Sequence, residues 1–235
     1  MRYEKTLFET NEIYTVHKYR TRKAWENGRY DLHGIGGSDA SAAIGLNPWR
    51  TNVDLWEIKT GRKEAPDISN AERVRYGQEA EEPIRRLFQL KRPEYEINYI
   101  PNCILQNKER PYLLYSPDGL IHDTKTGRNG ILEIKTTTIM KSYDSEKWWD
   151  KVNKVPVIPE NYYIQILHGL NVTGFGFADL YAELTYPSGS SELRTYHIEA
   201  EEVQEDLETV RNGVSAFWND HVLQDREPSL IIRGL

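Results

Sequence analysis

The stretch that decides the fold is Ser116-Pro117-Asp118-Gly119-Leu120, which is followed along the chain by Ile131-Leu132-Glu133-Ile134-Lys135. Successive side chains of a strand point to opposite faces, so Glu133 and Lys135 share one face. Asp118 comes from a neighbouring turn or strand and can converge on the same spot. Two carboxylates there can hold a divalent cation through oxygen ligands, and a lysine beside them can orient a water or stabilise charge on a phosphate. The pattern therefore predicts metal-dependent phosphodiester hydrolysis.

Each half of this motif has an ordinary explanation when taken alone. Pro-Asp-Gly is a common turn, and Glu-x-Lys on a strand is often a solvated ion pair. The combination is more informative because the apolar segments 113–115 and 130–132 both predict buried strands that lead into the motif. Charged groups at the ends of such strands cost stability unless a cation or another partner compensates them.

Length and composition predict one globular domain over residues 1–235. The apolar stretches are too short to cross a membrane, and the N-terminal segment 1–10 lacks the apolar core of a signal peptide, so we expect a cytoplasmic protein. The single cysteine, Cys103, excludes an internal disulfide framework and a cysteine-based zinc or iron–sulfur site. Its apolar neighbours predict a small core residue instead.

The net charge of −6 argues against a generic nucleic-acid coat, which would be basic. Much of the acidity lies in residues 199–208, which we expect on a C-terminal helix remote from the motif. Basic residues gather near the N-terminus and are either a track for DNA or an ordinary solvated surface; they are Lys18, Arg20, Arg22, Lys23 and Arg29.

Helices and strands alternate along the predicted chain. We expect Ser38 or Asp39 to cap a short helix over 40–44, and Asn52 to cap a helix over 53–60. The remaining expected elements are a helix over 70–90, strands over 95–100, 103–106, 112–116, 120–122 and 130–136, a helix over 160–170, strands over 174–183 and 193–198, and an amphipathic C-terminal helix. This order predicts an α/β fold in which helices flank a central mixed sheet.

Four blocks of sequence carry a resemblance to a known family: residues 34–40 (GIGGSDA), residues 76–81 (YGQEAE), the Asp118/Glu133/Lys135 core, and residues 162–168 (YYIQILH). In this order they resemble the YqaJ-type viral recombinases, the family of phage lambda exonuclease. That family belongs to the restriction-endonuclease-like superfamily with the PD-(D/E)xK motif, so the resemblance implies one such exonuclease domain.

The resemblance implies a larger catalytic set than the core motif. Glu81 becomes an additional carboxylate ligand, although a solvated helix face would explain it as well. The backbone carbonyl of Ile134 joins Asp118 and Glu133 at the first of two Mg²⁺ ions, for which Mn²⁺ can substitute. Gln165 donates to the attacking water, to a metal-bound oxygen or to the neighbourhood of Lys135, while His168 on nearly the same helix face is expected to be a packing residue.

The glycine-serine block suits phosphate, although it is not a Walker loop because no Lys-Ser/Thr follows at the required spacing. A helix N-terminus offers free N–H groups, and Ser38 adds a hydroxyl. The resemblance implies that Ser38 and Arg29 hold the 5′-phosphate or a backbone phosphate. Arg29 follows Trp25 in the family's Trp-x-x-x-Arg arrangement.

The resemblance further implies an Mg²⁺-dependent deoxyribonuclease that digests one strand of linear double-stranded DNA from 5′ to 3′. Relatives of the lambda type form trimers and act with a single-strand annealing protein in phage or prophage recombination. Trp148 and Trp149 could serve such an oligomer interface or lie in the core. Two alternatives stay open: another PD-(D/E)xK nuclease, either RecB-like or an endonuclease, and a DNA-end-binding module without activity.

Overall fold

The structure is a computed structural model that describes residues 6–67, 70–140 and 145–231. Its central sheet has five strands in the order β10-β9-β6-β5-β2. These are β2 (Tyr95–Asn98), β5 (Gly119–Asp123), β6 (Asn129–Thr138), β9 (Phe177–Thr185) and β10 (Ser191–Glu199). Strands β6 and β9 pair in parallel, and the other neighbours pair antiparallel. The predicted α/β class with a central mixed sheet is therefore confirmed.

Two smaller sheets accompany the central one. The first is three-stranded, in the order β1-β3-β4, and consists of β1 (Tyr14–Lys18), β3 (Cys103–Asn107) and β4 (Leu114–Tyr115). The second joins β7 (Trp149–Asp150) to β8 (Val155–Pro156). Cys103 is buried in β3, as expected, and burial raises the pKa of its thiol to about 12.

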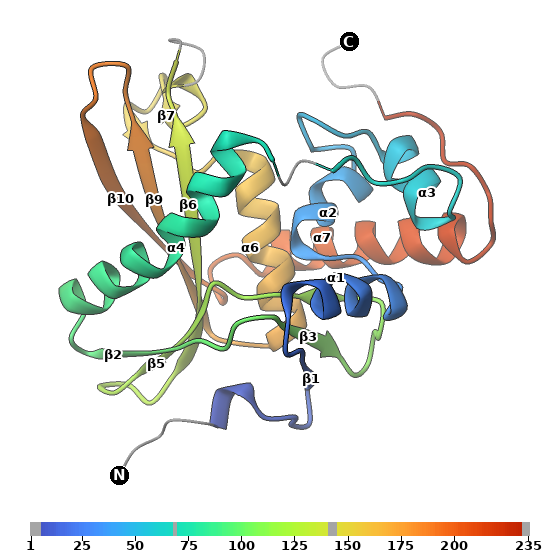
Figure 1. Cartoon of the computed structure of the whole chain (residues 1–235), viewed down its shortest axis with the longest axis horizontal. Coiled ribbons are helices and arrows are strands. Elements are labelled where there is room, and N and C mark those ends of the chain that lie inside the picture. Colours follow the sequence, from blue (N-terminus) through green and yellow to red (C-terminus); the bar gives the residue numbers. More distant parts are fainter. Residues whose placement is uncertain (1–5, 68–69, 141–144, 232–235) are drawn as a thin grey trace.

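Helices cover both faces of the central sheet (Figure 1). On one face lies α4 (Glu72–Lys91), and on the other lie α6 (Glu160–Thr173) and α7 (Gln204–Ala216), the latter continuing into a π-helical turn over Phe217–Val222. Helix α2 (Gly37–Ala43) packs against α6, and α3 (Asn52–Lys59) packs against α2. Helix α1 (Arg22–Asp31) lies on the same side of the molecule, and a 3-10 turn, Thr6–Phe8, precedes β1.

The alternation of β6 places its apolar residues in two separate cores. Leu132 and Ile134 are buried against Ile84 and Phe88 of α4, whereas Ile131 belongs to the core under α6. Strand alternation explains this division, because odd and even positions face opposite sides. Glu133 and Lys135 therefore face the α6 side together.

Several predicted boundaries were wrong. The helix predicted at 40–44 begins at Gly37, and its N-cap is Gly36 rather than Ser38 or Asp39. The cap of α3 is Thr51, which forms a capping box with Asp54. The side chain of Asn52 has a longer-range use, since its amide nitrogen donates to the carbonyl of Ser229 at 2.8 Å.

Other differences concern polar and aromatic segments. The N-terminal region contains β1 and α1, where no element was predicted, because Trp25 and Gly28 are the buried residues of α1 and leave no apolar stripe to recognise. The acidic stretch 199–208 is helical only from Gln204 onward. Trp148 is buried in the core and Trp149 is exposed. No helix among the described residues has the length and apolarity needed to cross a membrane.

Candidate active site

A cleft of about 240 Å³ lies where α1, α2, α4 and α6 meet the turn that precedes β5. Five of the predicted site residues line it: Arg29, Ser38, Glu81, Asp118 and Gln165. They come from segments far apart in the sequence, so the fold brings them together. Glu133 is reached from this cleft through Gln165 and Tyr115, which both line the cleft and donate to its carboxylate.

The ends of β5 and β6 position Asp118. The two strands pair only as far as Gly119 opposite Leu132, so β6 has an unpaired edge beyond that point. There Oδ2 of Asp118 accepts a hydrogen bond from the backbone N–H of Ile134 at 2.8 Å. The N–H and C=O of one strand residue point to the same side. The carbonyl of Ile134 therefore also faces the Asp118 side, where the sequence analysis placed it.

Glu133 is the centre of a buried polar cluster. Its side chain is 1% exposed and accepts hydrogen bonds from three donors. Lys135 donates at 2.5 Å and Gln165 donates to the same oxygen, Oε1, while the Tyr115 hydroxyl donates to Oε2 at 2.9 Å. Glu133, Lys135 and Gln165, three residues of the predicted catalytic set, therefore contact one another.

Burial makes the carboxylates of the cleft costly to ionise. Burial and the charge of Glu133 raise the pKa of Asp118 well above its usual value, although Lys135 opposes this rise. Burial also raises the pKa of Glu81, with Arg85 and Lys135 opposing. Burial disfavours the charged form of Lys135, but the charges of Glu133 and Asp118 outweigh that effect and raise the pKa of the ammonium. Lys135 is therefore protonated at neutral pH.

This donor set is suited to a hard divalent cation. The carboxylates of Asp118 and Glu81 line the cleft, and their raised pKa values indicate that added positive charge would stabilise the ionised forms. Among the residues that the structure describes, no group of three or more His, Cys, Asp or Glu side chains is arranged to hold an ion. Asp118 and Glu81 line the cleft, and Glu133 and the backbone of Ile134 adjoin it through their hydrogen bonds to Gln165 and Asp118.

Helix α4 approaches the sheet closely at Gly77, one turn before Glu81. A Cβ atom at Gly77 would lie 3.2 Å from the hydroxyl oxygen of Thr136 in β6. The glycine thus allows the close approach that the sequence analysis expected, and this approach brings Glu81 to the cleft.

The phosphate-binding candidates lie on α1 and α2. The guanidinium carbon of Arg29 is 4.9 Å from the ring centroid of Trp25. Gly36 leaves room for this side chain, because a Cβ there would lie 3.2 Å from an Arg29 nitrogen. Ser38 is exposed in the first turn of α2, on the wall of the same cleft.

The sequence analysis missed two residues that support the site. Arg85 donates from Nε to the backbone carbonyl of Asp118 at 2.6 Å, and its guanidinium carbon lies 3.5 Å from the ring centroid of Tyr99. The signal for Arg85 was its place four residues after Glu81, on the same helix face. Tyr115 could have been found from the rule that a buried tyrosine hydroxyl needs a partner.

His168 has the packing role that was expected. Its ring is 1% exposed, and Nε2 lies 3.0 Å from the carbonyl oxygen of Leu114. Burial lowers the pKa of the imidazole to about 4. Asp39, beside Ser38, is also buried and pairs with Lys59 at 2.8 Å and Arg50 at 3.0 Å.

This helix-flanked mixed sheet, with Asp118 at the start of β5 and Glu133 and Lys135 on β6, has the restriction-endonuclease-like fold. The model of the YqaJ-like viral recombinase domain matches residues 24–176, and the chain belongs to this family. It is 31% identical over 197 residues to the uncharacterized protein YqaJ of Bacillus subtilis (strain 168). The match covers 84% of this chain and 56% of the relative, so the chain spans little more than half of that protein's length.

Two solved structures share the fold. An alkaline exonuclease from Laribacter hongkongensis, LHK-Exo, superposes with a TM-score of 0.58 at 16% sequence identity, over 86% of this chain and 93% of that one. The structure of LHK-Exo in complex with dAMP gives a TM-score of 0.57 at 17% identity over the same shares. At this level of identity the similarity establishes the fold.

Proposed function

We propose that this chain is a metal-dependent DNA exonuclease. The observation that carries the proposal is the convergence of Asp118, Glu133 and Lys135 beside a cleft that also holds Arg29 and Ser38. Carboxylates with raised pKa values need a cation, and an arginine near them suits the phosphate of a substrate. The names of the structurally similar enzymes support the same activity.

Each side chain has a defined part in this proposal. Asp118, Glu133 and the Ile134 carbonyl would hold the cation, which we propose to be Mg²⁺ with Mn²⁺ as a substitute, and Glu81 would support a second ion. Bound Mg²⁺ would supply positive charge to the attacking and leaving oxygens. Lys135, protonated because of its carboxylate neighbours, would orient the attacking water by donating a hydrogen bond.

The other polar residues of the cleft would orient the water and bind the phosphate of the substrate. Gln165 shares the Oε1 atom of Glu133 with Lys135, so its amide would help to orient the same water. Arg29 and Ser38 would fix the 5′-phosphate or a backbone phosphate in line with that water. No covalent intermediate with the enzyme is required.

We extend the proposal to the biological role. The family description supports recombination, in which the enzyme would digest one strand of linear duplex DNA from 5′ to 3′ and a single-strand annealing protein would bind the other strand. We propose residues 1–235 as one nuclease domain that acts as a homo-oligomer, a trimer by resemblance, in the cytoplasm of a phage-bearing or prophage-bearing bacterium.

The test is the digestion of end-labelled linear duplexes and of closed circular duplexes, with Mg²⁺ or with a chelator. We expect Mg²⁺-dependent loss of one strand of the linear DNA, starting at the 5′ end, and no cleavage of the circle. Cleavage of the circle would favour the endonuclease alternative. Binding of DNA ends without hydrolysis, in Mg²⁺ and in Mn²⁺, would favour a binding module.

A further inference from the structure

Helix α1 presents a basic and aromatic face to the cleft. Arg22, Trp25 and Arg29 follow the period of an α-helix, and all three line the same cleft as Asp118 and Glu81. Arg29 already has a place in the proposed function. Arg22 and Trp25 do not, although they share its helix face.

Trp25 is a fixed platform for both arginines. Its side chain is buried, and the indole N–H lies 3.3 Å from the carbonyl of Cys103 and 3.3 Å from the hydroxyl of Ser116. The guanidinium carbon of Arg22 is 4.1 Å from the ring centroid, and that of Arg29 is 4.9 Å from it. Stacking on an aromatic face holds a guanidinium in place while its N–H groups stay available for other partners.

The guanidinium group of Arg22 makes only a weak contact with Glu26, so it can bind a ligand. Its Nε lies 3.3 Å from Oε1 of Glu26, and the two side chains are 58% and 47% exposed. Exposed pairs of this kind, four residues apart on a helix, are weak and screened by salt. A phosphate could therefore take the remaining N–H donors without the loss of a strong contact.

The cleft also contains carboxylates that a bound DNA strand would pass. Glu81 and Asp118 line the same cleft as Arg22. A DNA strand is a polyanion, and carboxylates repel it unless cations along its path offset them. The proposed function so far uses only one cation of α1, Arg29.

We propose that Arg22 is a second phosphate-binding residue, and that the Arg22–Trp25–Arg29 face of α1 binds a DNA strand through two neighbouring backbone phosphates. This inference rests on the proposed function and deepens it. Arg29 takes the phosphate nearer the carboxylates, and Arg22 takes the next one through the fork of its guanidinium group. Trp25 fixes the spacing of the two cations.

The test measures binding of end-labelled DNA without hydrolysis, in chelator, over a series of salt concentrations. We expect Arg22→Ala to weaken binding about ten-fold and to reduce the slope of log K against log salt by about 1, as for one lost phosphate contact. Arg22→Lys keeps the charge, so the slope should stay near that of the wild type while affinity falls because the fork is lost.

The chain offers a matched control in Arg86. This arginine of α4 pairs with Glu82, four residues away, is 77% exposed and does not line the cleft. Arg86→Ala should leave both affinity and slope unchanged. The inference would be overturned if Arg22→Ala and Arg86→Ala had the same DNA affinity and the same salt dependence. It would also be overturned if Arg22→Lys reduced the salt dependence as much as Arg22→Ala does. A wild-type protein that neither binds nor hydrolyses DNA would instead refute the proposed function itself.

Discussion

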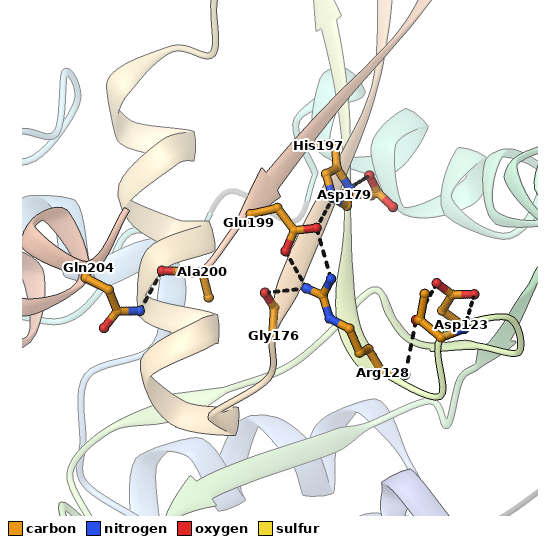
Figure 2. Close-up of polar contacts among 9 residues, drawn as sticks. Asp123, Arg128, Gly176, Asp179, His197, Glu199, Ala200 and Gln204 are labelled. Atoms are coloured by element: carbon orange, nitrogen blue, oxygen red, sulfur yellow. Dashed lines mark hydrogen bonds and ion pairs between the residues drawn. The ribbon is translucent and has the colours of Figure 1, made fainter. Parts of the chain in front are cut away.

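Two polar networks on the central sheet have opposite effects on the pKa of their carboxylates. In the network of Figure 2, Arg128 donates to Glu199 and to the carbonyl of Gly176, and His197 lies between Glu199 at 3.0 Å and Asp179 at 2.9 Å. Hydrogen bonds from Arg128, together with His197, lower the pKa of Glu199 to about 2. In the cleft, by contrast, burial and the charge of Glu133 raise the pKa of Asp118.

The difference separates a structural role from a functional one. Around Glu199 the cations balance the carboxylates, so the network stabilises the ends of β9 and β10 without any ligand. In the cleft, Lys135 and Arg85 lie near the carboxylates, yet burial still raises the pKa of Asp118 and of Glu81. Buried carboxylates whose pKa stays raised although cations lie nearby are expected at a site that binds an ion or a substrate.

The largest expected effect contrasts Asp118→Asn with Glu199→Gln. Asp118→Asn should lower the single-turnover rate of DNA hydrolysis about 1,000-fold, because a cation ligand is lost. Its melting temperature should be unchanged or higher, since a carboxylate repelled by Glu133 is removed and the acceptor for Ile134 is kept.

Glu199→Gln should lower stability and leave the rate of DNA hydrolysis unchanged. Its hydrolysis rate should equal that of the wild type, and its free energy of unfolding should fall by about 1 kcal/mol, a value reduced for screening because the Arg128 side chain is 44% exposed. The contrast between the two networks would be wrong if Asp118→Asn still hydrolysed DNA at the wild-type rate. It would also be wrong if Asp118→Asn lost as much stability as Glu199→Gln.

The next largest expected effect is on the pH dependence of stability, to which His168 and His197 contribute in opposite directions. His168 is buried without a carboxylate partner and its pKa falls from 6.5 to about 4, whereas bonds to Asp179 and Glu199 raise the pKa of His197 from 6.5 to about 9. Between pH 6.5 and 4 the unfolded chain binds a proton at His168 that the folded chain does not. Stability should therefore fall by about 3 kcal/mol as the pH drops through this window.

His197 acts in the alkaline direction. Its contribution is fully present below pH 6.5 and is lost as the pH rises through about 9. Because its side chain is 41% exposed, we expect only about 1 kcal/mol from it. Urea unfolding at a series of pH values should show a shallower acid limb in His168→Gln and a shallower alkaline limb in His197→Gln. Unchanged limbs in both variants would contradict these assignments.

The smallest effect concerns a hydroxyl group that orients Glu133. Tyr115→Phe keeps the ring and removes one of the three donors, so we expect kcat to fall about ten-fold with little change in KM. The matched control is Tyr163→Phe, which removes a hydroxyl bonded to Asp206 at 2.7 Å, away from the cleft. Equal kcat values for the two variants would show that Tyr115 has no positioning role.

The periodic elements were predictable from sequence because their patterns are local. The alternation of residues 130–136 predicted that Glu133 and Lys135 share one side of the strand, and the two side chains are hydrogen-bonded in the structure. The order of the four blocks was enough to indicate the family.

Contacts between distant segments were not predictable in the same way. The bond from Tyr115 to Glu133 joins two different sheets, and the bond from Asn52 to Ser229 explains why Asn52 is not a cap. Trp148 and Trp149 are adjacent in sequence, yet Trp148 is buried and Trp149 is exposed. This difference arises from packing against residues that are distant in sequence, so no local pattern could predict it. Helix α1 was missed for the same reason.

The early end of β5 has a further consequence for solubility. An unpaired strand edge is a template for strands of other chains, and natural proteins block such edges to avoid aggregation. Here the Asp118 side chain occupies the edge of β6 by accepting the Ile134 N–H, and Arg85 holds the backbone of Asp118 in place. The residue proposed to bind the cation thus also guards the sheet against edge-to-edge association. For this reason asparagine, which keeps the acceptor, is the informative replacement, whereas alanine would open the edge and confuse lost chemistry with aggregation.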